Sequence, residues 1–227
     1  MSSPEGPHTA FFYGTLMSPA VLHRVIHGTT TPSALQRLVS PLRTYPALLP
    51  HHIRHRVRGC DYPAVLPSSP SSATDTPSVR GTLVTGLSSA DLWRLDRFEG
   101  DEYERRRVDV TILGPGAGDD VQPEDMPQQQ HAPGSTVVAE TYIWIAGADR
   151  LEPREWDFDE FVREKLGRWT GQEGEAEYKD VDDAVAAATT ATGQGGNAMG
   201  GRDWNGAVGR AIDGSRVAEK EVLREAV

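Results

Sequence analysis

The ordered part of the chain opens with Ala10-Phe11-Phe12-Tyr13-Gly14-Thr15-Leu16-Met17, and the interpretation of the whole sequence starts from this stretch. Its first half is an aromatic run typical of a short strand, and Gly14 ends that run. Residues 18–28 then predict a helix, with Ser18 as its N-cap and Gly28 closing it. A strand that turns at a glycine into a helix offers consecutive backbone N–H groups at the turn, and such groups can bind an anion.

A second stretch, residues 88–100, predicts a helix with clear ends. Ser88 suits the N-cap, and Asp91 stands three residues later, where a capping box requires an acceptor. Gly100 suits the first position beyond the helix. Both boundaries of this helix therefore follow from local sequence.

Glu99 is an unusual residue for its place in this helix. It follows Leu95 by four residues, so it lies on or beside the apolar face. Burial would raise the pKa of its carboxyl towards the range of a general base. The alternative interpretation is that the helix frays at Phe98 and Glu99 points into water.

The remaining regular segments complete the prediction of the fold. Strands are expected at 79–85, 108–112 and 137–145, and a helix is expected over 153–166 with Pro153 at its first position. Strands and helices do not alternate regularly, which favours an α+β fold. A small, closed or nearly closed sheet with helices packed on it fits this order.

Several segments are expected to lie outside the packed domain, which spans 9–169. Residues 1–8 are interpreted as disordered, and two polar stretches, 67–78 and 114–135, as exposed insertions. Residues 170–227 carry eleven acids against six bases. They are interpreted as an acidic, Gly-rich, largely disordered tail with two weak helices, 179–191 and 215–226.

Composition excludes several classes of protein. The net charge of −10 does not suit binding to nucleic acid or to an anionic membrane surface. The single cysteine, Cys60, excludes a disulfide framework within one chain and fits a reducing compartment. The first residues do not form a signal peptide, and no apolar run is long enough for a membrane span. A soluble, cytoplasmic protein is expected.

Two motifs in this order resemble the gamma-glutamylcyclotransferase-like superfamily, most closely its avirulence-induced-gene branch. They are the turn that follows Phe11 and the segment Leu95-Asp96-Arg97-Phe98-Glu99-Gly100-Asp101-Glu102-Tyr103. The resemblance covers roughly residues 9–168. It implies a small mixed β-barrel with flanking helices and a pocket at the end of the first strand.

The resemblance also implies a reaction. A small-molecule γ-glutamyl substrate would cyclise, because its own α-amine attacks its γ-carbonyl and releases an amine or amino acid together with 5-oxoproline. The catalytic glutamate of the family falls on Glu99, and no metal or cofactor is implied. The substrate-binding turn falls on Tyr13, Gly14, Thr15 and Leu16, with Met17 and Ser18 adjoining.

Three further tyrosines are candidates for the pocket: Tyr62, Tyr103 and Tyr142. Each could hydrogen-bond a substrate amine, and each could equally be an ordinary amphipathic core residue. Glu102 is a competing carboxylate, expected to be exposed in a loop. The basic segment 51–58 is interpreted as a solvated strand or loop, because no third ligand accompanies His51 and His55.

Two other functions remain open at the level of sequence. One is a non-catalytic binding or regulatory protein that retains the fold and uses the acidic tail for a partner of unknown identity. The other is an amide hydrolase that uses water as the nucleophile in the same pocket. The leaving amine is not defined by the sequence.

Overall fold

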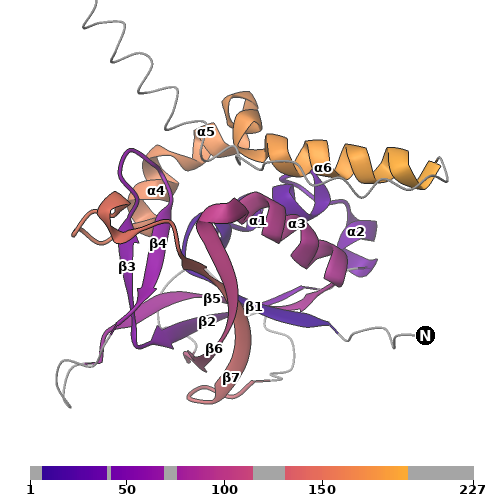
Figure 1. Cartoon of the computed structure of the whole chain (residues 1–227). Helices are drawn as coiled ribbons and strands as arrows, with labels where there is room; N and C mark the ends of the chain where they lie inside the picture. Colours follow the sequence, from indigo (N-terminus) through magenta and orange to yellow (C-terminus); the bar gives the residue numbers. More distant parts are fainter. Residues whose placement is uncertain (1–6, 40–41, 69–75, 115–130, 194–227) are drawn as a thin grey trace, which may run out of the picture.

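The computed structural model describes residues 7–39, 42–68, 76–114 and 131–193 (Figure 1). Its centre is a closed five-stranded barrel in the order β1-β5-β2-β6-β7. The strands are β1 His8–Phe12, β2 Arg43–Pro50, β5 Ser78–Leu87, β6 Tyr103–Ile112 and β7 Thr136–Trp144. Neighbouring strands are antiparallel, except that β1 closes the barrel by pairing parallel with β7. The prediction of an α+β fold built on a small mixed barrel is confirmed.

Successive side chains of β1 point to opposite faces of the strand and pack into two separate parts of the hydrophobic core. Phe11 points into the barrel, where it packs with Leu49, Leu83 and Val110. Phe12, the next residue, packs instead with the helices outside the barrel. Successive side chains of a strand point to opposite faces, so β1 contributes to both cores and is fixed from both sides. This brings the end of β1 to the boundary between barrel and helices.

Helices α1 Pro19–His27, α2 Ala34–Val39 and α3 Ser89–Glu99 lie on one side of the barrel (Figure 1). The predicted capping box is confirmed, because Asp91 N donates to the Ser88 hydroxyl while Ser88 N donates to the Asp91 carboxylate. Ser18 precedes α1 as predicted, but its side chain makes no capping hydrogen bond. The carbonyl oxygen of Ser18 accepts the first helical hydrogen bond, from Leu22 N at 3.0 Å, and Pro19 occupies the first helical position, where its missing N–H costs nothing.

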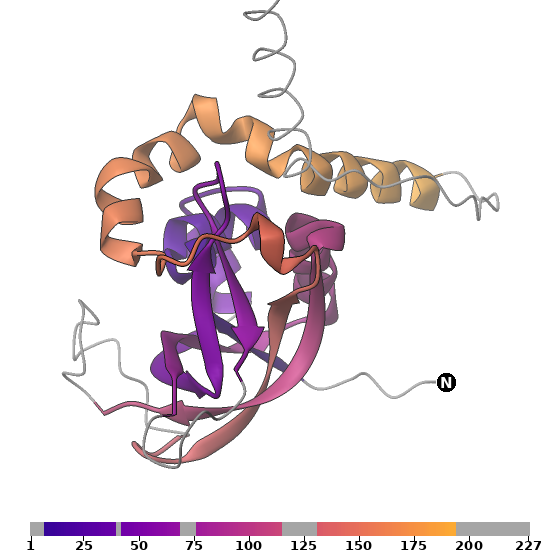
Figure 2. The same cartoon turned by 60° about the vertical axis from the view of Figure 1, so that its left-hand side comes forward.

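The hairpin formed by β3 His52–Arg56 and β4 Pro63–Pro67 stands beside the barrel (Figure 2). Strand β3 lies in the basic segment 51–58, which was interpreted as a solvated strand or loop. The strand is present, but solvation is incomplete, because Val57 is buried and four of the other residues are partly buried. Arg54 and Arg56 are partly buried and form ion pairs with Glu155 and Glu160. These partners follow the barrel by more than ten residues in sequence, so their proximity was not visible in a local pattern.

The C-terminal helices are α4 Phe158–Glu164, α5 Leu166–Thr170 and α6 Glu175–Gly193. Helix α4 begins five residues later than predicted, because Asp157 rather than Pro153 stands before its first turn and accepts a hydrogen bond from Glu160 N. None of the helices within the described ranges is long and apolar enough to cross a bilayer.

The predicted domain boundary at residue 169 is corrected. Helix α6 packs along α3, and Tyr178 and Val181 are buried there (Figures 1 and 2). Arg24 of α1 binds Asp182 through two hydrogen bonds of 3.0 and 2.7 Å. Apolar burial and this ion pair extend the packed domain into α6 as far as Asp182. The acidic composition concealed this because most charged residues of α6, such as Glu175 and Asp183, are exposed, whereas Glu177 lines a pocket.

Other predicted boundaries shift by small amounts. Strand β1 begins at His8, so order starts before residue 9. Pro67 is the last residue of β4 and Ser78 is the first residue of β5, so the first insertion is shorter than predicted by one residue at each end. In the second insertion, residues 131–135 form turns that lead into β7. Residues 69–75 and 115–130 of the two insertions, and the predicted helix at 215–226, lie outside the described residues.

Candidate active site

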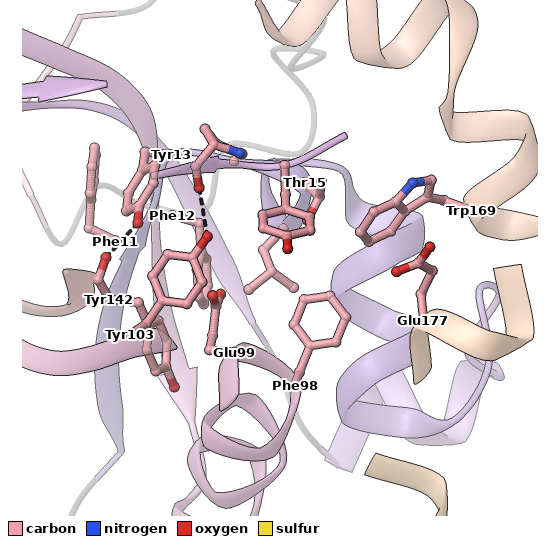
Figure 3. Close-up of a pocket in the computed structure, with 14 residues that line it drawn as sticks. Phe11, Phe12, Tyr13, Thr15, Phe98, Glu99, Tyr103, Tyr142, Trp169 and Glu177 are labelled. Carbon is pink, nitrogen blue, oxygen red and sulfur yellow. Dashed lines mark hydrogen bonds between the residues drawn. The ribbon is translucent and has the colours of Figure 1, made fainter. Parts of the chain in front are cut away.

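Glu99 is the last residue of α3 and points into a pocket between the barrel and the helices (Figure 3). It is half-buried, and within the described ranges its carboxylate has no hydrogen-bond or ion-pair partner. Burial raises the pKa of Glu99 to about 8, and the negative charge of Asp96 acts in the same direction. Its position at the negative end of the helix dipole also disfavours the charged form. Glu99 can therefore exchange a proton near neutral pH.

The turn predicted to bind substrate follows β1 directly and continues into the short 3-10 helix η1 Thr15–Met17. Two of its carbonyl groups are used, by hydrogen bonds from Met17 N to Gly14 O (2.9 Å) and from Ser18 N to Thr15 O (3.1 Å). The N–H groups of Gly14, Thr15 and Leu16 have no acceptor among the described residues. Three consecutive unpaired N–H groups are suited to binding an anion.

The predicted tyrosines surround this turn and Glu99. Tyr103, only 9% exposed, donates from its hydroxyl to Pro63 O at 2.9 Å, and Tyr142 donates to Asp96 Oδ1 at 2.9 Å. Tyr13 donates to the backbone oxygen of Tyr142 at 2.5 Å. Burial raises the pKa of all three phenols, so they stay protonated. Their O–H groups are engaged by protein acceptors, while their oxygens keep lone pairs that can accept from a substrate ammonium.

Tyr62 completes the set of predicted tyrosines and also lines the pocket. Burial raises the pKa of its phenol, and the neighbouring Cys60 thiol acts in the same direction. Cys60 itself is buried, and burial raises the pKa of its thiol, which disfavours the reactive thiolate form. Glu102, expected to be exposed, is instead half-buried and paired with Arg150.

The pocket has an empty volume of about 530 Å³, including its open mouth. Of the predicted site residues it brings together Glu99, the turn from Tyr13 to Leu16, and the three candidate tyrosines. It does not bring in Met17 or Ser18. Met17 packs against the helix-side core and Ser18 is buried, because the 3-10 turn rotates their side chains away from the cavity.

Six lining residues were not predicted as part of the site from sequence: Phe11, Phe12, Pro63, Phe98, Trp169 and Glu177. Phe98 points away from Glu99 towards Trp169, and their rings meet edge to face with centroids 6.4 Å apart (Figure 3). Burial raises the pKa of Glu177, although Arg168 Nη1 lies 3.4 Å from its Oε1. The C-terminal helices thus form the outer wall of the pocket. Their composition gave no signal, since only tertiary packing brings them there.

The charged side chains that line the pocket are all acidic. Glu99 and Glu177 line it, and no Lys, Arg or His does so among the described residues. The same described ranges hold no group of three or more His, Cys, Asp or Glu side chains arranged to bind a metal ion. A ligand carboxylate would therefore depend on the unpaired backbone N–H groups of the turn.

Comparison with known proteins gives a consistent result. Residues 10–158 match the family described as gamma-glutamyl cyclotransferase, AIG2-like. In Arabidopsis thaliana, protein AIG2 C is 29% identical over 160 residues, which cover 70% of this chain and 75% of that protein. AIG2-like protein B of the same organism is 30% identical over 165 residues, which cover 72% and 75%.

A solution structure of another Arabidopsis thaliana protein is 26% identical and covers 74% of this chain and 88% of its own, with a TM-score of 0.44. The family match includes the barrel, the turn and Glu99, but it ends at the first residue of α4. Trp169 and Glu177 therefore lie beyond the matched region.

Proposed function

The chain belongs to the gamma-glutamyl cyclotransferase, AIG2-like family, and from this premise we propose that it cyclises a γ-glutamyl amine or peptide. The substrate α-amine attacks the γ-carbonyl carbon, a new C–N bond closes the five-membered ring, and the original amide C–N bond breaks. The products are 5-oxoproline and a free amine. Nucleophile and electrophile belong to one molecule, so binding it in the correct conformation removes most of the entropic cost of their encounter.

The observation that carries this proposal is the unpartnered carboxyl of Glu99, with its pKa raised to about 8, inside the pocket. An amine attacks only after losing its ammonium proton, and a base with a pKa near that of the amine accepts this proton efficiently. When the substrate ammonium lies beside Glu99, its positive charge favours the carboxylate form. The protonated Glu99 then delivers the proton to the departing nitrogen, so one residue serves both steps in sequence.

The turn supports the same reaction. Its three unpaired N–H groups supply positive ends of dipoles for the α-carboxylate of the substrate or for the oxyanion that develops on the γ-carbonyl oxygen. The phenol oxygens of Tyr103 and Tyr142 can accept from the ammonium as it approaches Glu99. A reducing compartment suits the single free thiol, and we place the activity in the cytoplasm.

The test is release of 5-oxoproline by purified protein from a panel of γ-glutamyl amino acids, γ-glutamyl amines and glutathione. Glu99→Gln should abolish release, whereas Asp101→Asn, an exposed acid two residues away, should retain it. The panel would identify the leaving group. Equal ligand binding by the wild type and Glu99→Gln with no product from either would instead support a binding protein. Release of free glutamate in place of 5-oxoproline would indicate hydrolysis.

A further inference from the structure

Arg54 of β3 reaches the substrate-binding turn from outside the pocket. Its Nη1 donates to the carbonyl oxygen of Tyr13 at 3.0 Å and to that of Arg80 at 3.3 Å. Its Nη2 donates to Glu155 Oε1 at 2.9 Å, and its guanidinium lies 5.6 Å from the centroid of the Trp156 ring. The side chain is only 11% exposed. Arg54 therefore joins the hairpin, the barrel and the segment before α4 at one point, the end of β1.

The contact with Tyr13 O determines the direction of the next N–H group. No described peptide bond is cis, and in a trans peptide the C=O and the following N–H point in opposite directions. Tyr13 and Gly14 line the pocket but Arg54 does not. Holding Tyr13 O on the side away from the pocket therefore directs Gly14 N–H into it. The positive charge on the carbonyl also polarises the peptide and strengthens its N–H as a donor.

This geometry matters because the pocket itself is acidic. Glu99 and Glu177 line it, no basic residue does so among the described residues, and Arg168, the ion-pair partner of Glu177, lies outside the lining. An anionic ligand must find its positive potential in the turn. We propose that Arg54 is a positioning residue, which fixes and polarises the Tyr13–Gly14 peptide so that the turn binds the carboxylate of the γ-glutamyl group and of 5-oxoproline. The identity of this ligand rests on the proposed function.

Arginine is suited to this task for a geometric reason. Its planar fork donates to two backbone carbonyls and one carboxylate at once and stacks on Trp156, whereas a lysine ammonium is a single point charge on a flexible stem. We therefore expect Arg54→Lys to restore only part of the function, which distinguishes directed hydrogen bonding from charge alone.

The experiment measures binding directly and does not require turnover. 5-Oxoproline and 2-pyrrolidinone share the lactam ring, but only the first carries a carboxylate. Arg54→Met should weaken binding of 5-oxoproline about tenfold, measured by NMR titration, and should change binding of 2-pyrrolidinone less than twofold. Arg54→Lys should fall between Arg54→Met and the wild type. Arg56→Met is the matched control: Arg56 shares the strand, pairs with Glu160 at 3.0 Å and makes no contact with the turn, so both affinities should stay within twofold.

Equal weakening of both ligands in Arg54→Met would overturn the inference, because it would indicate general damage to the pocket. An unchanged affinity for 5-oxoproline, or no binding of it by the wild-type protein, would also overturn it. If Arg54→Met does not fold, Arg54→Lys carries the same comparison of the two ligands. Binding that depends on Arg54 without turnover of any γ-glutamyl compound would refute the proposed reaction and leave this inference intact.

Discussion

Gly14 lies so close to Pro63 that a Cβ atom on Gly14 would stand 2.8 Å from Pro63 Cγ and 2.9 Å from Cδ. Both atoms belong to a stiff ring, so the contact cannot be relieved by a rotamer change. Pro63 also accepts the Tyr103 hydroxyl through its carbonyl oxygen. The turn, the first residue of β4 and a pocket tyrosine are therefore coupled through one close approach.

Gly14→Ala is expected to impair function more than folding. Either the turn or Pro63 must move, and displacement of the unpaired N–H groups should lower kcat/KM for 5-oxoproline release at least tenfold. Overpacking of this kind costs about 1–3 kcal/mol of stability, which urea denaturation would measure. Gly167→Ala is the control, because a Cβ there meets nothing within 4 Å. Activity of Gly14→Ala equal to that of the control would show that the turn tolerates the shift.

The rate should depend on pH through Glu99. Its carboxyl acts as a base only when deprotonated, so kcat/KM should rise with pH through a limb near the pKa of about 8. Asp96→Asn should move this limb to lower pH, because it removes a negative charge that raises the pKa of Glu99. The asparagine oxygen can still accept from the Tyr142 hydroxyl. A pH–rate profile that does not move in Asp96→Asn would contradict the assignment of the limb to Glu99.

Local sequence predicted those features that depend on local physics. Sequence predicted the capping box of Ser88 and Asp91, and it also predicted that Gly28 ends α1, where this residue adopts a left-handed conformation. Both predictions were possible because helix capping depends on a few consecutive residues. Burial of Glu99 followed from the spacing of one apolar stripe. The alternative that Glu99 points into water is excluded by its position in the pocket.

The features that were missed depend on segments far apart in sequence. Trp169 and Glu177 reach the pocket only because α5 and α6 fold back over α3, and an acidic segment with weak helical pattern gives no sign of that. The basic pattern of residues 51–58 gives no sign that Arg54 is buried, because its four partners come from three segments that are far apart in sequence. Met17 was assigned to the site by its neighbours in sequence, although a single 3-10 turn is enough to rotate a side chain away.

Glu99 should reduce stability in alkaline solution. The folded pKa of about 8 lies above the ordinary value of 4.5, so between these values the folded state binds more protons than the unfolded state, and stability falls as pH rises. One pKa unit corresponds to about 1.4 kcal/mol, and partial exposure of Glu99 screens part of the total. We expect Glu99→Gln to be about 2 kcal/mol more stable than the wild type above pH 8 and nearly equal at pH 5. Urea denaturation at both pH values checks this, and a variant less stable than the wild type at high pH would disagree with it.

Trp169 tests whether the C-terminal helices belong to the folded domain. Its ring is buried and meets Phe98, Phe161 and Tyr178 edge to face or nearly so. Trp169→Ala should cost about 3–5 kcal/mol of unfolding free energy, as expected for removal of a large buried ring. Arg163→Ala, on the exposed side of α4, should change it by less than about 0.5 kcal/mol. If Trp169→Ala, like Arg163→Ala, changes the unfolding free energy by less than about 0.5 kcal/mol, this segment does not contribute to the core. A large loss confined to Trp169→Ala would make the outer wall of the pocket an integral part of the domain, although the match to the family ends before it.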